Sequence, residues 1–159
     1  MTIARPAPRF TAIRKARRDR AMTMSEGGYL CGKVRYRISA EPTDAGWCHC
    51  RNCQLNSGSP AMAFANVPVA DFAFIAGDTL VGRYQSSEIG HRAFCTACGT
   101  PLYFKAEEEE SIAFSIATLD APETVTPGYH IFYASHIAWA GAADDLPRYA
   151  KLRSDGDPL

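Results

Sequence analysis

The stretch "WCHCRNCQLNSGSP", residues 47–60, holds three of the chain's six cysteines, Cys48, Cys50 and Cys53, around one histidine. Three interpretations compete: a disulfide cluster, a thiol redox centre and a metal site. The first residues of the chain carry charge but lack the apolar segment of a secretory signal peptide, so we expect a reducing, cytoplasmic environment. In such a compartment, closely spaced cysteines favour metal binding or redox chemistry over structural disulfides.

The C-x-C-x-x-C spacing of this stretch fits a zinc site with an open position. Cys48 and Cys50 would point to opposite faces of an extended strand, so they can share an ion only if the chain bends. The residues after Cys50 are rich in turn formers, and a short helix or turn there would supply the bend. Three thiolates leave one tetrahedral position free, which is typical of a catalytic zinc site. His49 is a candidate fourth ligand, but because both of its neighbours are ligands we expect it to point away and to pack beside the site.

The other three cysteines form a second candidate set. In "FCTACGTPLYF", residues 94–104, Cys95, Cys98 and Gly99 have the C-x-x-C-G pattern of a zinc knuckle, in which the glycine supplies a positive φ. Cys31 is the remaining cysteine, and the three together lack one ligand of a closed zinc site. The alternatives are reduced thiols packed in the core and a redox pair. The strand-like sequences around Cys95 and Cys98 disfavour the redox pair, because a redox C-x-x-C requires a helix N-terminus.

Alternation of apolar and polar residues predicts a mainly β protein. In "KVRYRIS", residues 33–39, Val34, Tyr36 and Ile38 alternate with charged side chains, as in a half-buried strand. Further strand candidates are residues 61–67, 71–77, 80–86, 91–95, 101–106, 111–119 and 130–135. The acidic residues 107–110 lie between two of these candidates, where we expect a solvated hairpin loop. The pattern predicts several small coiled antiparallel sheets that carry zinc knuckles, with few short helices.

The charge of the chain is unevenly distributed. Residues 1–23 hold seven basic residues and one acidic residue, whereas the rest of the chain holds ten basic and sixteen acidic residues. We expect residues 1–24 to be a disordered basic extension, residues 25–152 to be one zinc-binding domain, and residues 153–159 to be a short tail. Attraction of the basic arm to nucleic acid, or a role as an organelle transit segment, is the alternative. The chain contains no run of about 18 apolar residues, so the sequence predicts no membrane-spanning helix.

Five segments occur in an order that resembles the glutathione-dependent formaldehyde-activating enzyme family, which also includes centromere protein V. They are "GGYLCGKVRYRI", "CHCRNCQLNSGS", "HRAFCTACGTPLYF", "SIATLDAP" and "HIFYASHIAWAGAADDLPRY", within about residues 26–150. The resemblance implies a fold of coiled antiparallel sheets and two zinc sites. The catalytic site would be Cys48, Cys50 and Cys53, and the structural site would use Cys31, Cys95 and Cys98.

Tyr29 departs from the family pattern, because it stands where the family has the fourth cysteine of its structural zinc site. A phenol with a pKa of about 10 is a poor zinc ligand beside thiolates. We therefore expect one or two zinc ions per chain, with the second site bound through three thiolates and water, bound weakly, or empty.

The resemblance implies a zinc-dependent carbon–sulfur lyase or synthase. Such an enzyme would join a small aldehyde, such as formaldehyde, to its co-substrate glutathione as S-hydroxymethylglutathione, or cleave that adduct. Arg51 and Arg92 lie beside cysteine motifs and are candidates to bind the glutathione carboxylates, with a plain surface position as the alternative. Two other functions stay open: a non-enzymatic zinc module that binds a protein or nucleic acid, and a thiol oxidoreductase. The acidic body of the chain argues against a broad nucleic-acid surface.

Single residues outside the cysteine motifs give weaker predictions. We expect packed or exposed side chains, not metal ligands, at His91, His130 and His136, which lack partners at metal spacing. We expect Trp139 to be a core aromatic residue and Asp120 to fix a turn.

Overall fold

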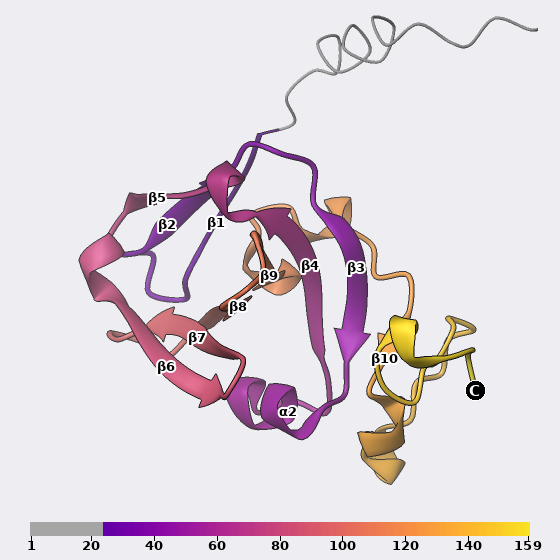
Figure 1. The fold of residues 1–159 in the computed structure, drawn as a ribbon. Coiled ribbons are helices and arrows are strands. Elements are labelled where there is room, and N and C mark those ends of the chain that lie inside the picture. Colours follow the sequence, from indigo (N-terminus) through magenta and orange to yellow (C-terminus); the bar gives the residue numbers. More distant parts are fainter. Residues whose placement is uncertain (1–23) are drawn as a thin grey trace, which may run out of the picture.

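The computed structural model describes residues 24–159, and the predicted basic extension at residues 1–24 therefore lies almost wholly outside the described residues. Two sheets dominate the fold (Figure 1). The smaller sheet has three antiparallel strands in the order β1-β2-β5, formed by Ser25–Gly28, Arg35–Ile38 and Phe72–Ala76. The predicted alternation in the second of these strands is confirmed, because Tyr36 and Ile38 are fully buried.

The larger sheet has seven strands in the order β10-β3-β4-β9-β8-β7-β6. Its neighbours pair antiparallel, except that β10 runs parallel to β3. The strands, in chain order, are β3 Thr43–Cys48, β4 Met62–Pro68, β6 Val81–Ser87, β7 Gly90–Cys95, β8 Pro101–Ala106, β9 Ser111–Ser115 and β10 His130–Ile131. The prediction of a mainly β fold built from antiparallel sheets is confirmed.

Helices are few and short. The single α-helix of the described residues, α2, spans Arg51–Ser57 and begins directly after the second cysteine of the first motif, as predicted. The remaining helical segments are 3-10 turns at Val69–Asp71, Asp78–Leu80, Ile116–Thr118, Pro122–Thr124, Tyr133–Ser135, Ala138–Ala140 and Arg153–Asp155. Between residues 24 and 159, no helix is long and apolar enough to cross a membrane.

The structure corrects several of the predicted strands. β1 and β3 were missed, because "SEGG" and "TDAGWC" contain glycines and polar residues in place of an alternating apolar pattern. The candidate at 111–119 ends as a strand at Ser115, and the candidate at 130–135 pairs only over His130–Ile131; both continue as 3-10 turns. The acidic residues 107–110 are exposed between β8 and β9, so the predicted hairpin loop is confirmed.

Two buried clusters hold the sheets together. The larger cluster lies between the two sheets and includes the fully buried side chains of Val34, Tyr36, Leu102 and Phe114. The smaller cluster lies at the C-terminal end of β3 and contains Cys48, Cys53, Met62, Tyr129 and Ile131. The first cysteine motif is therefore part of an apolar cluster of its own.

Two single-residue expectations change in the structure, and one contact of the C-terminal residues was not expected. Trp139 is 79% exposed, so the prediction of a core aromatic residue is wrong: the 3-10 turn that carries it lies on the surface. Asp120 pairs with the guanidinium of Arg35 across the smaller sheet, in place of the expected turn contact. In the predicted tail, Arg153 forms an ion pair with Asp44 at 2.6 Å and lies over the ring of Tyr129.

Candidate metal centres

Cys48, Cys50 and Cys53 converge where β3 meets α2. Their sulfur atoms all lie within 4.8 Å of one another. Sulfurs around a tetrahedral zinc ion at about 2.3 Å would lie about 3.8 Å apart, so this donor set fits zinc with only small adjustments. The predicted grouping of the three thiols is confirmed as geometry, and the group can hold a metal ion.

The bend that the sequence required lies at Cys50. This residue has extended backbone angles (φ −63°, ψ 151°) and caps the N-terminus of α2, where its sulfur accepts a hydrogen bond from the backbone N–H of Cys53 at 3.4 Å. At the other end, Gly58 closes the helix in the left-handed region with φ 65°. The short helix thus carries Cys53 back towards Cys48, which a continued strand could not do.

One sulfur of this group is more accessible than the other two. Cys48 and Cys53 are buried, whereas Cys50 is half-buried. Hydrogen bonds from the Cys48 and Cys53 thiols lower the pKa of Cys50. The same contacts, with burial, raise the pKa of Cys48. A thiolate is therefore favoured at Cys50, on the accessible side of the group.

Arg92 lies against the buried side of this centre. It comes from β7, only 9% of its surface is exposed, and its Nη2 is 3.7 Å from the sulfur of Cys53. The guanidinium lies over the ring of Phe104 at 5.2 Å, and its Nε has no hydrogen-bond partner among the described residues. The alternative of a plain surface position is thus wrong for Arg92. Arg51, by contrast, is exposed and donates to the side chain of Gln54 at 3.2 Å.

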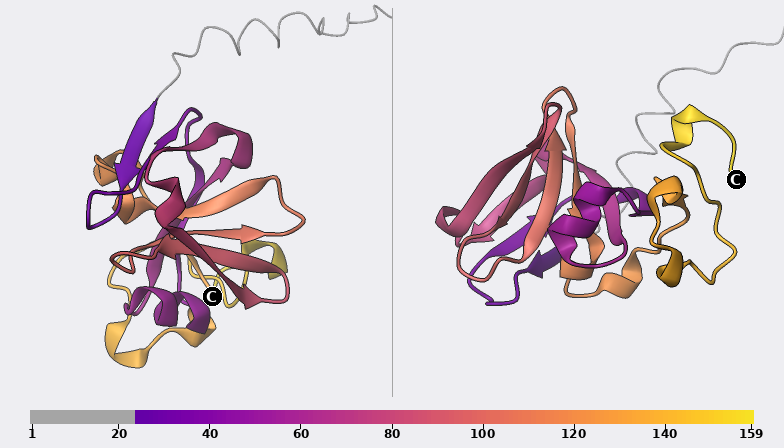
Figure 2. Two further views of the ribbon diagram at one scale, coloured as in Figure 1. Left: turned by 90° about the vertical axis from the view of Figure 1, so that its left-hand side faces the viewer. Right: turned by 90° about the horizontal axis from the view of Figure 1, so that it is seen from below.

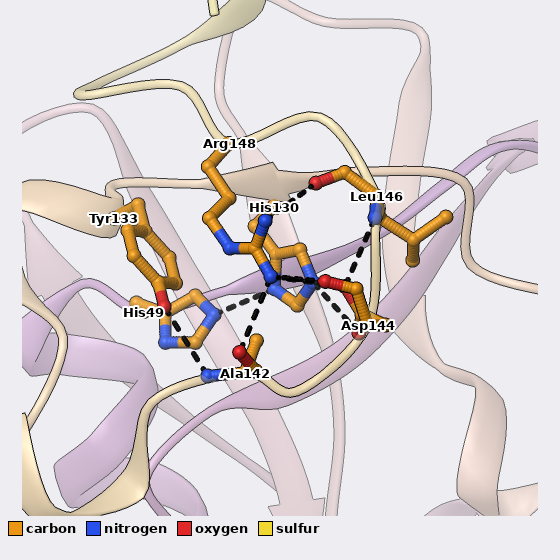
Figure 3. A network of polar contacts seen from close by, with 7 residues as sticks. All are labelled: His49, His130, Tyr133, Ala142, Asp144, Leu146 and Arg148. Atoms are coloured by element: carbon orange, nitrogen blue, oxygen red, sulfur yellow. Dashed lines mark hydrogen bonds and ion pairs between the residues drawn. The ribbon is translucent and has the colours of Figure 1, made fainter. Parts of the chain in front are cut away.

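His49 points away from the thiols into a polar network supplied by the C-terminal segment (Figure 3). Its Nε2 lies 2.9 Å from Nδ1 of His130, whose Nε2 lies 3.1 Å from a carboxylate oxygen of Asp144. Arg148 contacts the same carboxylate at 3.4 Å and lies over the ring of Tyr133. Both histidines are 3% exposed, so the expectation that they pack is confirmed.

Hydrogen bonds hold the backbone of His49, the residue between Cys48 and Cys50, on both sides. The backbone N–H of His49 donates to Ile131, and its carbonyl accepts from the Gln54 amide at 2.8 Å, which also donates to Ser135 at 3.0 Å. Figure 2 shows α2 between the strands and the C-terminal segment, consistent with these contacts. Burial, then the nearby His130, lowers the pKa of His49 to about 4, so its ring is neutral near pH 7.

The second group, Cys31, Cys95 and Cys98, also converges within 4.8 Å. Cys31 lies in the turn between β1 and β2, and its sulfur is 3.7 Å from that of Cys95 at the end of β7. Gly99 takes the predicted positive φ, 77°, and its N–H donates to the Cys95 carbonyl at 2.8 Å. This group therefore joins the turn of the smaller sheet to the β7–β8 turn of the larger one.

Tyr29 lies two residues before Cys31 and is 5% exposed. Its hydroxyl is buried and has no hydrogen-bond partner among the described residues. Burial, followed by the nearby Cys95, raises the pKa of this phenol. The second group therefore has three thiols and a neutral phenol, which do not make the four-ligand set of a closed zinc site.

Comparison with known proteins identifies the family. The sequence model of the glutathione-dependent formaldehyde-activating enzyme family matches residues 24–135. This chain belongs to that family. The predicted resemblance is thus confirmed over β1 to β10, including all six cysteines of the two groups.

A curated relative and a solved structure agree with the assignment of this chain to the formaldehyde-activating enzyme family. An uncharacterized lyase of Schizosaccharomyces pombe is 35% identical over 79 residues, which cover 50% of this chain and 56% of that protein. The chain thus aligns with only about half the length of that curated relative. The crystal structure of a Rhodobacter sphaeroides protein matches with a TM-score of 0.53 and 22% identity, covering 64% of this chain and 91% of that one, and supports the fold.

Sequence reasoning named Arg92 as a candidate site residue but missed its contact with Cys53, and it missed the contacts of His130 with His49 and Asp144. Alternation along β7 indicates only that Arg92 and His91 face opposite sides of the strand. No pattern in the sequence says which side meets the thiols, because β7 follows Cys53 by 37 residues and reaches it through the sheet order.

Proposed function

We propose that this chain is a zinc-dependent carbon–sulfur lyase or synthase that acts on adducts of glutathione with small aldehydes, such as S-hydroxymethylglutathione. The observation that carries the proposal is the convergence of Cys48, Cys50 and Cys53 into a three-thiol group with one accessible sulfur. Family membership supports the substrate class.

The reaction needs a sulfur nucleophile and a proton delivered to the aldehyde oxygen. In the synthetic direction the glutathione sulfur bonds to the aldehyde carbon, the carbon–oxygen π bond opens, and the thiol proton ends on that oxygen. Cys48, Cys50 and Cys53 would hold zinc, which when bound supplies a Lewis acid that stabilises a thiolate or polarises an aldehyde oxygen. Glutathione would approach on the side of Cys50, because Cys48 and Cys53 are buried.

Arg92 supplies the positive charge that this centre needs. Three thiolates and a divalent ion together carry a net charge of −1, and the guanidinium beside Cys53 offsets it. The exposed guanidinium of Arg51 is the better placed candidate for a glutathione carboxylate, whereas the buried Arg92 acts on the charge of the centre itself. A charge-assisted hydrogen bond of this kind is worth about 1.5–3 kcal/mol.

Metal analysis combined with glutathione titration tests the proposal. Native protein should turn over S-hydroxymethylglutathione and bind glutathione in its zinc-loaded form. Cys50→Ser should lose one zinc ion, glutathione binding and turnover together. Undiminished glutathione binding by Cys50→Ser would refute the assignment of this centre.

Arg92 is tested with a matched surface variant. Arg92→Met should weaken the use of the glutathione adduct by about 10-fold or more in kcat/KM, consistent with the loss of a charge-assisted contact. Arg83→Met, at an exposed position of the neighbouring strand β6, should leave kcat/KM unchanged. Equal effects of the two substitutions would remove Arg92 from the site.

A thiol oxidoreductase is the second candidate, and one observation favours it. Cys50 and Cys53 form a C-x-x-C at the N-terminus of α2, which is the placement that a redox pair requires. Alkylation with and without a chelator separates the two candidates. A zinc enzyme is protected from alkylation until the chelator is added, whereas a metal-free redox cysteine reacts at the same rate in both conditions.

A further inference from the structure

The second cysteine group lacks one ligand of a closed zinc site. Among the described residues, the group that could hold an ion consists of Cys31, Cys95 and Cys98, with no further histidine, cysteine or carboxylate. The distance of 3.7 Å between the Cys31 and Cys95 sulfurs is close to the spacing of about 3.8 Å between thiolates on one tetrahedral zinc ion. The three sulfurs are therefore placed for an ion, although the fourth ligand is missing.

A buried phenol stands at the sequence position of the missing cysteine. Tyr29 precedes Cys31 by two residues, so a cysteine there would complete a C-x-C turn. Its side chain is 95% buried, and its hydroxyl has no hydrogen-bond partner among the described residues. Tyr29 belongs to the same buried cluster as Cys95, and Cys31 and Cys98 pack against that cluster.

A buried hydroxyl without a partner is unfavourable, by about 1–3 kcal/mol. Buried polar groups of this kind therefore call for an acceptor, either in the protein or in a ligand. Thiolate sulfurs bound to a metal ion accept hydrogen bonds, and the sulfurs of this group are the nearby candidates. The other polar side chain at the group, Thr100, already has contacts: its hydroxyl lies 3.2 Å from the Cys98 sulfur and accepts from the Leu30 N–H at 3.3 Å.

We propose that Cys31, Cys95 and Cys98 form an open, exchangeable site for one thiophilic divalent ion such as Zn²⁺. In this site the hydroxyl of Tyr29 donates a hydrogen bond to a metal-bound thiolate and does not serve as the fourth ligand. Because Cys31 and Cys98 are only half-buried, the fourth coordination position would be filled by water from their side of the group. The ion is thus held by three sulfurs and is released more readily than from a closed four-thiolate site.

The ion would act as a reversible cross-link between the two sheets. Cys31 belongs to the β1–β2 turn of the smaller sheet, whereas Cys95 and Cys98 belong to the β7–β8 turn of the larger sheet. An ion that binds only the folded chain stabilises it in proportion to the logarithm of its free concentration. The site would therefore couple the stability of the fold to the supply of the metal, independently of catalysis at Cys48, Cys50 and Cys53.

Restoring the missing sulfur tests the proposal. Native chain, Tyr29→Cys, Tyr29→Phe and Cys31→Ser are loaded with Zn²⁺ or Co²⁺ and titrated with a chelator. Native chain should hold two ions, one of which the chelator removes first, and Cys31→Ser should lack that ion only. Tyr29→Cys should hold the same ion about 100-fold more tightly or better, whereas Tyr29→Phe should hold it about 10-fold less tightly.

The cobalt spectrum counts the sulfurs and guards against misfolding. The near-ultraviolet thiolate-to-cobalt absorption should correspond to three sulfurs in native chain and Tyr29→Phe, and to four in Tyr29→Cys. Retention of the ion at the first group reports that each variant is folded. Unchanged affinity in Tyr29→Cys, a four-sulfur spectrum in native chain, or no second ion in native chain would each overturn the proposal.

Discussion

Replacing His49 with glutamine should change the pH dependence of stability. His49 is 3% exposed, and burial followed by the nearby His130 lowers the pKa of its ring to about 4. In the unfolded chain the same ring titrates at about 6.5. Below pH 6.5 the His49 ring therefore binds a proton in the unfolded chain, whereas in the folded chain it binds one only near pH 4 and below. Native stability is lost as the pH falls through this window, and the glutamine variant lacks this loss.

The size of the effect follows from the two pKa values. At pH 5 the unfolded ring is almost fully protonated, whereas about a tenth of the folded rings are, which gives a difference of about 2 kcal/mol. At pH 7.5 both forms are neutral, and the contribution is close to zero. The stability advantage of the native chain over His49→Gln should thus shrink by about 2 kcal/mol between pH 7.5 and pH 5.

Urea unfolding at several pH values, in reducing buffer, measures this difference. Acid also releases metal from the thiols, but it does so in both proteins, so the difference between them isolates the histidine. Leu55→Gln, on the exposed face of α2, is the control for a substitution that removes no titrating group. Parallel stability curves for native chain and His49→Gln would refute the reasoning, because they would mean that the buried ring is protonated at the same pH in both states.

Three further predictions concern packing and surface contacts. A Cβ at Gly46 would lie 2.6 Å from the ring of Tyr129, so Gly46→Ala should lower the free energy of unfolding by about 1–3 kcal/mol, whereas a Cβ at Gly128 meets no atom closer than 3.9 Å. Thermal unfolding compares Gly46→Ala with Gly128→Ala, and equal stabilities would contradict the contact. Trp139→Ser should cost less than about 0.5 kcal/mol, because the indole is exposed, and a larger loss in urea unfolding would place it in the core. Asp120→Asn should cost at most about 1 kcal/mol, since its ion pair with Arg35 lies at the surface, and should cost less at high salt; a salt-independent effect would argue against an ion pair.

Local chemistry gave the first cysteine group and the Cys95–Cys98 pair of the second, whereas Cys31, 64 residues before Cys95, was added as the remaining cysteine and through the family resemblance. In the first group, three cysteines within six residues can meet only if the chain bends, and the helix after Cys50 supplies that bend. In the second group, a C-x-x-C-G sequence requires a tight turn, which the positive φ of Gly99 provides. Short cysteine spacings constrain the backbone directly. When two or three cysteines are separated by only one or two residues, few backbone conformations let their sulfurs meet at one ion.

The sequence by itself determined the β class, the two thiol groups and the family, since alternation and cysteine spacing are local properties of the chain. Only the tertiary structure decided what surrounds those groups. Arg92 reaches Cys53 across 39 residues, and His130 reaches His49 across 81. Such contacts depend on the order of strands in the larger sheet, where β10 lies beside β3 although six other strands separate them along the chain. Strand order is set by the free energy of burying whole faces, and no single segment of sequence encodes it.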